Sequence, residues 1–159
     1  EVSRSLAACE GALLLVDAAQ GVQAQTMANF FLALDGGLEI VPALNKIDLQ
    51  AARPKEVMAE MESLLGIRPS DVIPVSAKTG KGVDDVLRAI VLRVPPPKGS
   101  PEGPLQAIVF DSLYDDYRGV VVFVRLRSGT IRKRDRIFTL GTRQGYEVLD
   151  RGGVKRGRA

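Results

Sequence analysis

The chain has 159 residues, 45% of them hydrophobic, which suffices for one ordinary domain, or one domain and part of another, with a buried core. It has no histidine and a single cysteine, Cys9, so an internal disulfide is excluded and a reducing compartment is expected. The net charge of +3 is unevenly spread: residues 1–117 contain 10 Lys/Arg and 16 Asp/Glu, a net charge of −6, whereas residues 118–159 contain 12 and 3, a net charge of +9.

Three apolar runs, each followed by a helical pattern, occupy residues 11–94. The runs are GALLLVDA (11–18), EIVPALNKID (39–48) and DVIPVSAK (71–78). Apolar residues recur at helical spacing in residues 27–34, 57–65 and 83–94. Continuous apolar strands that alternate with helices predict an α/β fold, a parallel sheet with flanking helices on both faces. Pro42 and Pro74 lie inside two of the strands and weaken the prediction of their full length.

The segment PPPKGSPEGP (95–104) is a stiff, polar linker, and it predicts a boundary between domains at residues 1–94 and 105–159. Beyond it the spacing favours strands and shows no helical periodicity. The strand candidates are LQAIVFDS, GVVVFVRLR, TIRKRDRIFTLG and GYEVL. Four short strands rarely close a barrel, so we predict part of an antiparallel β-barrel.

Polar residues stand where each of the three apolar runs ends. They are Asp17, then Asn45, Lys46 and Asp48, then Ser76, Ala77 and Lys78. Ligands of open parallel sheets bind beyond the carboxyl ends of the strands, so these groups are expected at one edge. The Asp48 carboxylate can accept two hydrogen bonds side by side. Guanine offers that pair of donors, its ring N–H and its amino group, and adenine does not.

The other residues at this edge complete a predicted guanine site. Asn45 either bonds the guanine acceptors O6 and N7 or braces a neighbouring loop. Lys46 and Lys78 have apolar stems that can cover the two faces of a flat base while their ammonium groups stay in water. The backbone N–H of Ala77 can point at O6, and Ser76 can hold the Asp48 loop by a hydrogen bond.

Three other features have simpler interpretations. Asp17 is either a helix cap or a loop brace, and the sequence leaves both open. The stretch from Thr79 to Gly82 suggests a phosphate loop, but that pattern needs glycine at Val75 and Ser or Thr at Gly82, so a loop before the last helix, with a glycine in a special backbone conformation, is favoured. Cys9 is expected to be a packed helix residue and not a nucleophile, because no histidine can activate it.

Several longer stretches resemble the elongation factor 4 (LepA) family of ribosome-binding translational GTPases. They are EVSRSLAACEGALLLVDAAQGVQAQT, PALNKIDL, VSAKTGKGVDDVL, PPPKGSPEGPLQAIVFDSLYDDYRGVV and SGTIRKRDRI. NKID and SAK resemble base-recognition motifs that nearly all GTPases share, whereas SLAACEGALLLVDA and PLQAIVFDS are more specific. The resemblance covers residues 1 to about 150 and implies the C-terminal half of a P-loop-type GTPase domain, followed by part of a β-barrel domain.

The resemblance implies that Asn45, Lys46, Asp48, Ser76, Ala77 and Lys78 bind the guanine of GTP. It also implies that the phosphate loop, the Mg²⁺-binding threonine and the catalytic histidine belong to segments upstream of Glu1. No catalytic residue and no metal ligand are therefore expected in this chain, which starts without Met and is expected to be a fragment or a processed chain. Two departures are Arg134, where the family usually has glycine in a barrel turn, and the tail GGVKRGRA (152–159).

The function expected is that of a fragment of a GTPase that binds and hydrolyses GTP with Mg²⁺ during translation elongation, although the fragment alone is expected to be inactive. Ribosomal RNA is the expected partner of the basic segment 118–159. Alternatives are a non-catalytic nucleotide- or RNA-binding module, another translational GTPase of the elongation factor G class, and a metabolic α/β domain that binds a different nucleotide.

No apolar stretch reaches the roughly 18 residues of a membrane span, and peripheral membrane association stays open. A bacterial cytoplasm fits the sequence, and so does a mitochondrial matrix or a chloroplast stroma.

Overall fold

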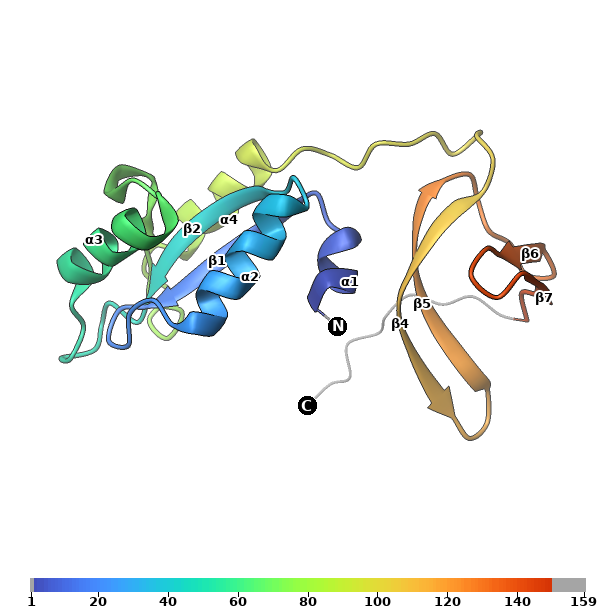
Figure 1. Cartoon of the computed structure of the whole chain (residues 1–159), viewed down its shortest axis with the longest axis horizontal. Coiled ribbons are helices and arrows are strands. Elements are labelled where there is room, and N and C mark those ends of the chain that lie inside the picture. Colours follow the sequence, from blue (N-terminus) through green and yellow to red (C-terminus); the bar gives the residue numbers. More distant parts are fainter. Residues whose placement is uncertain (1, 150–159) are drawn as a thin grey trace. The chain divides into compact units, whose positions relative to one another are not determined.

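A computed structural model describes residues 2–149 of the chain, in two compact units (Figure 1). Among these residues, one unit contains 2–97 and 109–125, and the other contains 98–108 and 126–149. Residues 94–105 contain neither helix nor strand, in keeping with a linker there. The predicted domain limits at 94 and 105 stay a prediction.

A three-stranded parallel sheet lies at the centre of residues 2–97 (Figure 1). Its order is β1 (Gly11–Asp17), β2 (Glu39–Asn45) and β3 (Ile73–Pro74), and Asp17 stands beside Asn45 in the register. The predicted parallel sheet is confirmed. The second strand runs through Pro42 over seven residues, whereas the third has only two and ends at Pro74.

Helices flank the sheet, and three of them overlap the segments in which apolar residues recur at helical spacing. The helical elements are α1 (Val2–Ala7), α2 (Ala24–Asp35), α3 (Pro54–Leu65), the 3₁₀ turn η1 (Pro69–Asp71) and α4 (Val83–Arg93). The third begins on Pro54, whose fixed φ suits the first turn, and ends at Gly66, which has φ 69°. Cys9 was expected inside a packed helix, and this is wrong: α1 ends at Ala7, and Cys9 is exposed.

Successive side chains of β2 point to opposite faces of the sheet, so this strand contributes to a core on each face. Leu44 packs with Val16 on β1 and with Val57 and Met61 on α3, and each of these side chains is at most 1% exposed. Its neighbour Ala43 packs with Val75 and Val86, which is on α4. Helices α3 and α4 therefore cover opposite faces, as the sequence predicted.

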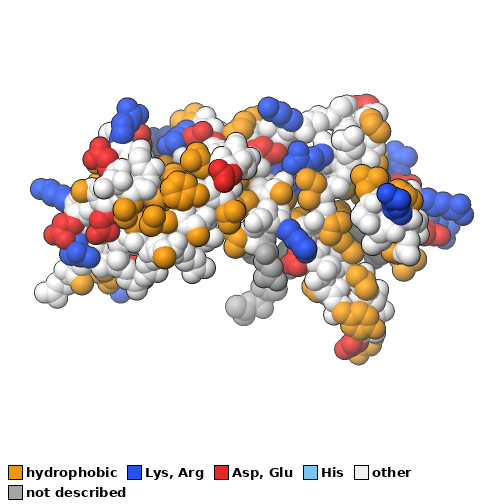
Figure 2. All heavy atoms as spheres, in the orientation of Figure 1, with side chains coloured by type: hydrophobic (Ala, Val, Ile, Leu, Met, Phe, Trp, Pro, Cys, Tyr) orange, Lys and Arg blue, Asp and Glu red, His pale blue; other side chains and the backbone are white. Residues whose placement is uncertain are grey.

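Part of each apolar stripe remains exposed. On α2, Phe30 is 7% exposed whereas Phe31 is 44% exposed, and on α4 Val86 is 7% exposed whereas Val91 is 79% exposed. Figure 2 shows apolar side chains at the surface, between charged ones. Helical spacing thus identified the apolar faces correctly but did not identify which parts of them are buried.

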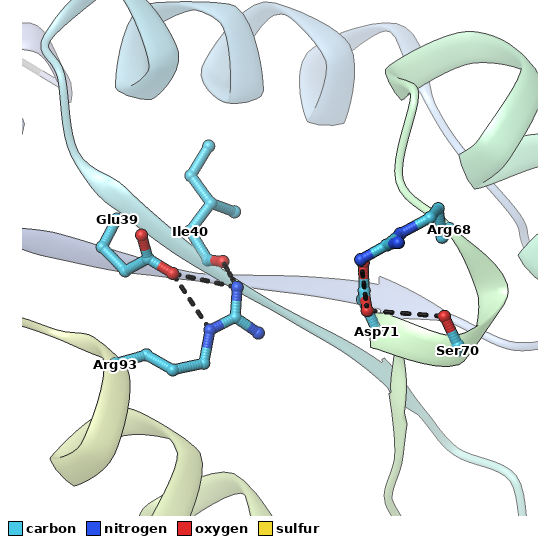
Figure 3. A network of polar contacts seen from close by, with 6 residues as sticks. All are labelled: Glu39, Ile40, Arg68, Ser70, Asp71 and Arg93. Atoms are coloured by element: carbon cyan, nitrogen blue, oxygen red, sulfur yellow. Dashed lines mark hydrogen bonds and ion pairs between the residues drawn. The ribbon is translucent and has the colours of Figure 1, made fainter.

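An ion pair and a hydrogen bond to the backbone tie the start of β2 to the last turn of α4 (Figure 3). Arg93 Nε donates to Glu39 Oε1 at 3.0 Å, and Arg93 Nη2 donates to the carbonyl oxygen of Ile40 at 2.9 Å. In the same figure, Arg68 donates to Asp71 at 3.0 Å just before β3. These contacts lie at the amino-terminal edge of the sheet and leave the opposite edge for the polar groups predicted there.

Residues 105–149 contain only strands among their regular elements. The strands β4 (Gln106–Asp115) and β5 (Gly119–Ser128) form one two-stranded sheet, and β6 (Arg136–Thr139) pairs antiparallel with β7 (Gln144–Glu147). A parallel sheet with flanking helices followed by antiparallel strands confirms the predicted fold class. None of the side chains in residues 98–149 is buried.

The turn before β6 explains why glycine would suit position 134. Arg134 has φ 71°, a left-handed conformation that glycine adopts without strain, and its N–H donates to the carbonyl oxygen of Val148 at 2.7 Å. The second departure from the family pattern, the tail at 152–159, lies outside the described residues.

Candidate nucleotide-binding site

The polar groups predicted from the three strand ends gather at the carboxyl edge of the sheet. Asp17 and Asn45 are register partners at the ends of β1 and β2. The N–H of Val75 donates to the carbonyl oxygen of Leu44 at 2.8 Å, which continues the pairing beyond β3 and brings Ser76 next to the same edge. The topology thus places the ends of all three strands together, as the sequence predicted.

A serine–aspartate hydrogen bond joins the two predicted base-recognition loops. Ser76 Oγ donates to Asp48 Oδ1 at 2.6 Å and accepts the N–H of Thr79 at 3.2 Å. Ser76 is 1% exposed, whereas Asp48 lies at the surface. The hydroxyl bond, helped by the charge of Lys78, lowers the pKa of the Asp48 carboxyl below its ordinary value of 3.8. The predicted bracing role of Ser76 is confirmed, and Asp48 is held as a carboxylate.

A second contact joins the same loops through Asn45. The backbone N–H of Ala77 donates to Asn45 Oδ1 at 3.1 Å. Of the two roles left open for Asn45, the structure shows the bracing one. The Ala77 N–H, which was expected to point at guanine O6, is engaged with Asn45 here, while the amide nitrogen of Asn45 keeps its capacity to donate.

Lys46 reaches back across the sheet edge to Asp17. Its Nζ lies 2.6 Å from Asp17 Oδ2, and its backbone has φ 65°, a conformation that residues other than glycine seldom adopt. The other oxygen, Asp17 Oδ1, accepts the N–H groups of Ala19 at 2.8 Å and Gln20 at 3.2 Å. Asp17 is therefore a loop brace and not a helix cap, because α2 begins only at Ala24.

The contact between Asp17 and Lys46 was not predicted from the sequence. The hydrogen bond from Lys46 is the main cause that lowers the pKa of the Asp17 carboxyl below 3.8. The available signal was the pairing of two strand ends, which places residue 17 beside residue 45 once the register is known.

The loop between Ser76 and α4 is shaped by two glycines with positive φ. Gly80 has φ 81° and donates its N–H to the carbonyl oxygen of Ser76 at 2.9 Å, which closes a turn. Gly82 has φ 74°, and a Cβ there would overlap the carbonyl oxygen of Pro74. The interpretation of residues 79–82 as a loop into the last helix is confirmed. Lys78 is exposed at this loop.

Within residues 2–149, no three His, Cys, Asp or Glu side chains lie together as a metal-binding group. Among the helices of this part of the chain, none has the length and apolar character required to cross a membrane.

The segment that contains these polar groups matches a known protein family. Residues 1–96 match the family model described as the elongation factor Tu GTP binding domain. The matched range includes all six residues predicted to bind guanine.

Curated relatives match nearly the whole chain. Elongation factor 4 of Thermobifida fusca is 57% identical over 152 residues, which are 96% of this chain and 25% of that protein. Elongation factor 4 of Synechocystis sp. is 57% identical over 154 residues, 97% of this chain and 25% of that protein. The protein of that name from Clostridium acetobutylicum is 54% identical over 152 residues. The chain thus spans about a quarter of the length of these relatives, and the resemblance inferred from the sequence is confirmed.

A solved structure shares the fold. The crystal structure of translation elongation factor SelB from Methanococcus maripaludis, in its apo form, matches 90% of this chain and 32% of its own chain with a TM-score of 0.74. The sequence identity is 23%, so this likeness concerns the fold alone.

Proposed function

Because the chain belongs to the family of the elongation factor Tu GTP-binding domain, we propose that it supplies guanine recognition to a GTPase of translation elongation. The base-binding residues proposed are Asn45, Lys46, Asp48, Ser76, Ala77 and Lys78. The observation that carries the proposal is the 2.6 Å bond between Ser76 and Asp48, which joins the two predicted base-recognition loops and keeps a carboxylate at the sheet edge.

The chemistry of the Asp48 carboxylate favours guanine over adenine. Ser76 occupies one side of Oδ1, and the carboxylate keeps lone pairs on both oxygens for further donors. The ring N–H and amino group of guanine are two adjacent donors that fit such an acceptor pair. Adenine lacks that pair and would leave the carboxylate unmatched, at a large cost in affinity.

GTP hydrolysis is proposed for the whole protein and not for this chain alone. Phosphoryl transfer depends on groups that surround the phosphates and on Mg²⁺ that neutralises developing charge. Among residues 2–149, no three His, Cys, Asp or Glu side chains lie together as a metal-binding group, and the sequence contains no phosphate-loop pattern. We therefore expect the 159-residue chain by itself to show no GTP turnover, and measurable hydrolysis by a clean preparation would contradict this.

The ribosome is the proposed partner of the basic C-terminal segment. Basic residues cluster around β6 and β7, at Arg132, Lys133, Arg134, Arg136 and Arg143. Figure 2 shows blue side chains at the edge of the view where Figure 1 places β6 and β7. Lys/Arg clusters of this kind bind RNA phosphates and release counterions. Binding of the chain to ribosomes should therefore weaken steeply as salt rises, whereas a flat salt dependence would contradict RNA contact.

The proposed location is the bacterial cytoplasm, where the elongation factor 4 relatives named above would work. A mitochondrial matrix or chloroplast stroma also remains compatible with this sequence. A non-catalytic RNA-binding module is the alternative function, and it rests on the same basic cluster without the guanine site.

The test of guanine recognition uses the substitution Asp48→Asn. We would introduce it into a hybrid protein, in which this chain's matched segment replaces the corresponding 152 residues of Elongation factor 4 from Thermobifida fusca. Asparagine has an NH₂ donor in place of one carboxylate oxygen of Asp48, and xanthine has a carbonyl acceptor in place of the amino group of guanine. The preference should therefore move from guanine to xanthine nucleotides. Loss of a paired contact in a site built for it can change discrimination on the order of 10⁴-fold. The measurement is competition of GDP, XDP and ADP against a fluorescent nucleotide.

The matched control is Asp35→Asn, the same change at the exposed end of α2. Its nucleotide preference should equal that of the unmodified hybrid. If Asp48→Asn kept its full preference for GDP over XDP, the role proposed for Asp48 would be wrong.

A further inference from the structure

The ion pair between Lys46 and Asp17 crosses the carboxyl edge of the sheet and has no assigned role in base recognition. Lys46 follows the last residue of β2, and Asp17 is the last residue of β1. Their charged atoms lie 2.6 Å apart, with Lys46 50% exposed and Asp17 17% exposed. The lysine side chain therefore lies across two adjacent strand ends at the surface of the proposed base site.

The aspartate end of this pair is rigidly held. Asp17 Oδ1 accepts two backbone N–H groups, and the Asp17 carbonyl oxygen accepts the N–H of Gly21 at 2.9 Å. The next residue, Ala18, is 0% exposed and donates its N–H to the Asn45 carbonyl oxygen at 2.8 Å. The carboxylate is thus fixed relative to the backbone that carries the lysine.

The lysine end has an uncommon backbone conformation. With φ at 65°, Lys46 occupies the left-handed region, and such residues gather at binding sites where their surroundings enforce the geometry. A free lysine side chain samples many rotamers, and ordering it costs free energy. Since Asp17 fixes the ammonium and the strand end fixes the backbone, the methylenes between them are held in one arrangement before any ligand arrives.

We propose that Asp17 is a positioning residue for guanine nucleotide binding, which acts by holding the Lys46 side chain as a preformed apolar face for the base. This inference rests on the proposed function, because it requires that the base bind at this edge. Asp17 itself does not touch the nucleotide. Because Asp17 already holds the Lys46 side chain in the free protein, the nucleotide does not have to pay for the loss of side-chain entropy of Lys46 when it binds.

The remaining charged groups near Asp17 do not replace Lys46. Arg53 Nη2 reaches the carbonyl oxygen of Ala19 at 3.5 Å, but its Nη1 pairs with Glu56 at 2.9 Å. On the side of α3, Glu60 accepts the N–H of Val22 at 3.2 Å and adds a negative charge to this region. Lys46 is the cation that lies in contact with the Asp17 carboxylate, and it is the main cause of the lowered pKa of that carboxyl.

The test separates the ion pair from the turn that Asp17 also braces. Asp17→Asn keeps an oxygen that can accept the N–H groups of Ala19 and Gln20 but removes the charge that holds Lys46. In the hybrid protein, we expect Asp17→Asn to weaken GDP binding roughly tenfold, a typical coupling for contacting charged groups. Lys46→Met should weaken it as well, and adding Asp17→Asn to Lys46→Met should change nothing further. The control Glu56→Gln, which disrupts an ion pair outside the site, should keep the affinity of the hybrid.

Two outcomes would overturn the inference. One is an Asp17→Asn variant with unchanged GDP affinity, and the other is an effect of Asp17→Asn that persists in full in the Lys46→Met background. In the second case Asp17 would act through its turn and not through Lys46. The Asp48→Asn experiment tells which proposal has failed: a shift to XDP beside a neutral Asp17→Asn contradicts only the positioning role, whereas no shift contradicts the guanine site itself.

A nucleotide-free measurement tests the pair directly in the 159-residue chain. The carbon-13 signal of the Asp17 carboxyl should titrate below 3.8, and Lys46→Met should raise that pKa toward 3.8. An unchanged Asp17 titration in Lys46→Met would show that the ion pair does not form, and the inference would be wrong regardless of nucleotide affinity.

Discussion

The α/β region, residues 2–97, and the β-strand region, residues 105–149, differ in burial and in charge. The first has a core in which Leu44, Met61 and Val57 are 0% exposed. The second has strands of up to ten residues, yet none of its side chains is buried. Residues 2–97 contain 9 Lys/Arg and 11 Asp/Glu, a net charge of −2, whereas residues 105–149 contain 8 and 5, a net charge of +3.

This contrast shows that regular strands do not by themselves make a core. Two-stranded sheets have two open faces, and burial requires a further layer against at least one of them. The three parallel strands receive that layer from α3 and α4, on opposite faces. The polar contacts of the proposed guanine site lie in the α/β region, which has a buried core. The basic residues around β6 and β7 lie in the β-strand region, which has none.

The largest expected difference between the regions is in the cost of truncating a leucine. Leu44→Ala removes a fully buried side chain from between β1 and α3, so the free energy of unfolding should fall by about 2–5 kcal/mol. The matched change Leu140→Ala removes a side chain that is 85% exposed, and its effect should stay within about 0.5 kcal/mol. Urea denaturation of the 159-residue chain measures both. Equal losses would show that the β-strand region is packed in solution.

A smaller difference is expected for glycine substitutions. Gly82→Ala would place a Cβ against the carbonyl oxygen of Pro74 at φ 74°, and we expect it to lower the free energy of unfolding by about 1–3 kcal/mol. Gly141 has no heavy atom within 4 Å of a Cβ position and no positive φ, so Gly141→Ala should be neutral or slightly stabilising. A Gly82→Ala variant as stable as Gly141→Ala would contradict the loop geometry beside Ser76. Denaturant midpoints, compared at equal slopes, decide this.

Much of the α/β region could be predicted from the sequence, because its signals are local. The three apolar runs gave the parallel strands, and Pro54 marked the start of α3. The link between Ser76 and Asp48 followed from residue type and strand order alone. Each of these depends on a short stretch and on the rule that parallel strands end at one edge.

The features that the sequence did not predict depend on neighbours. Periodicity identified Phe31 and Val91 as part of apolar faces, but their exposure depends on which other segments cover them. The contact from Lys46 to Asp17 requires the strand register and a left-handed backbone at Lys46, neither of which a residue pattern specifies. Cys9 was assigned to a helix that ends two residues earlier, and helix ends are the least certain part of any pattern.

The smallest effect expected is a change in acid sensitivity within the α/β region. The pKa of Asp48 lies below 3.8 chiefly because of the Ser76 hydroxyl, so the unfolded chain binds a proton at this group more readily than the native chain. The stabilisation is complete above pH 3.8 and is lost as the pH falls through the lowered native value. Ser76→Ala should raise the pKa of Asp48 toward 3.8, while Asp17, whose pKa Lys46 lowers, should titrate as before. Carbon-13 titration of both carboxyls checks this, and a parallel shift of Asp17 would mean that the substitution disturbs the whole sheet edge.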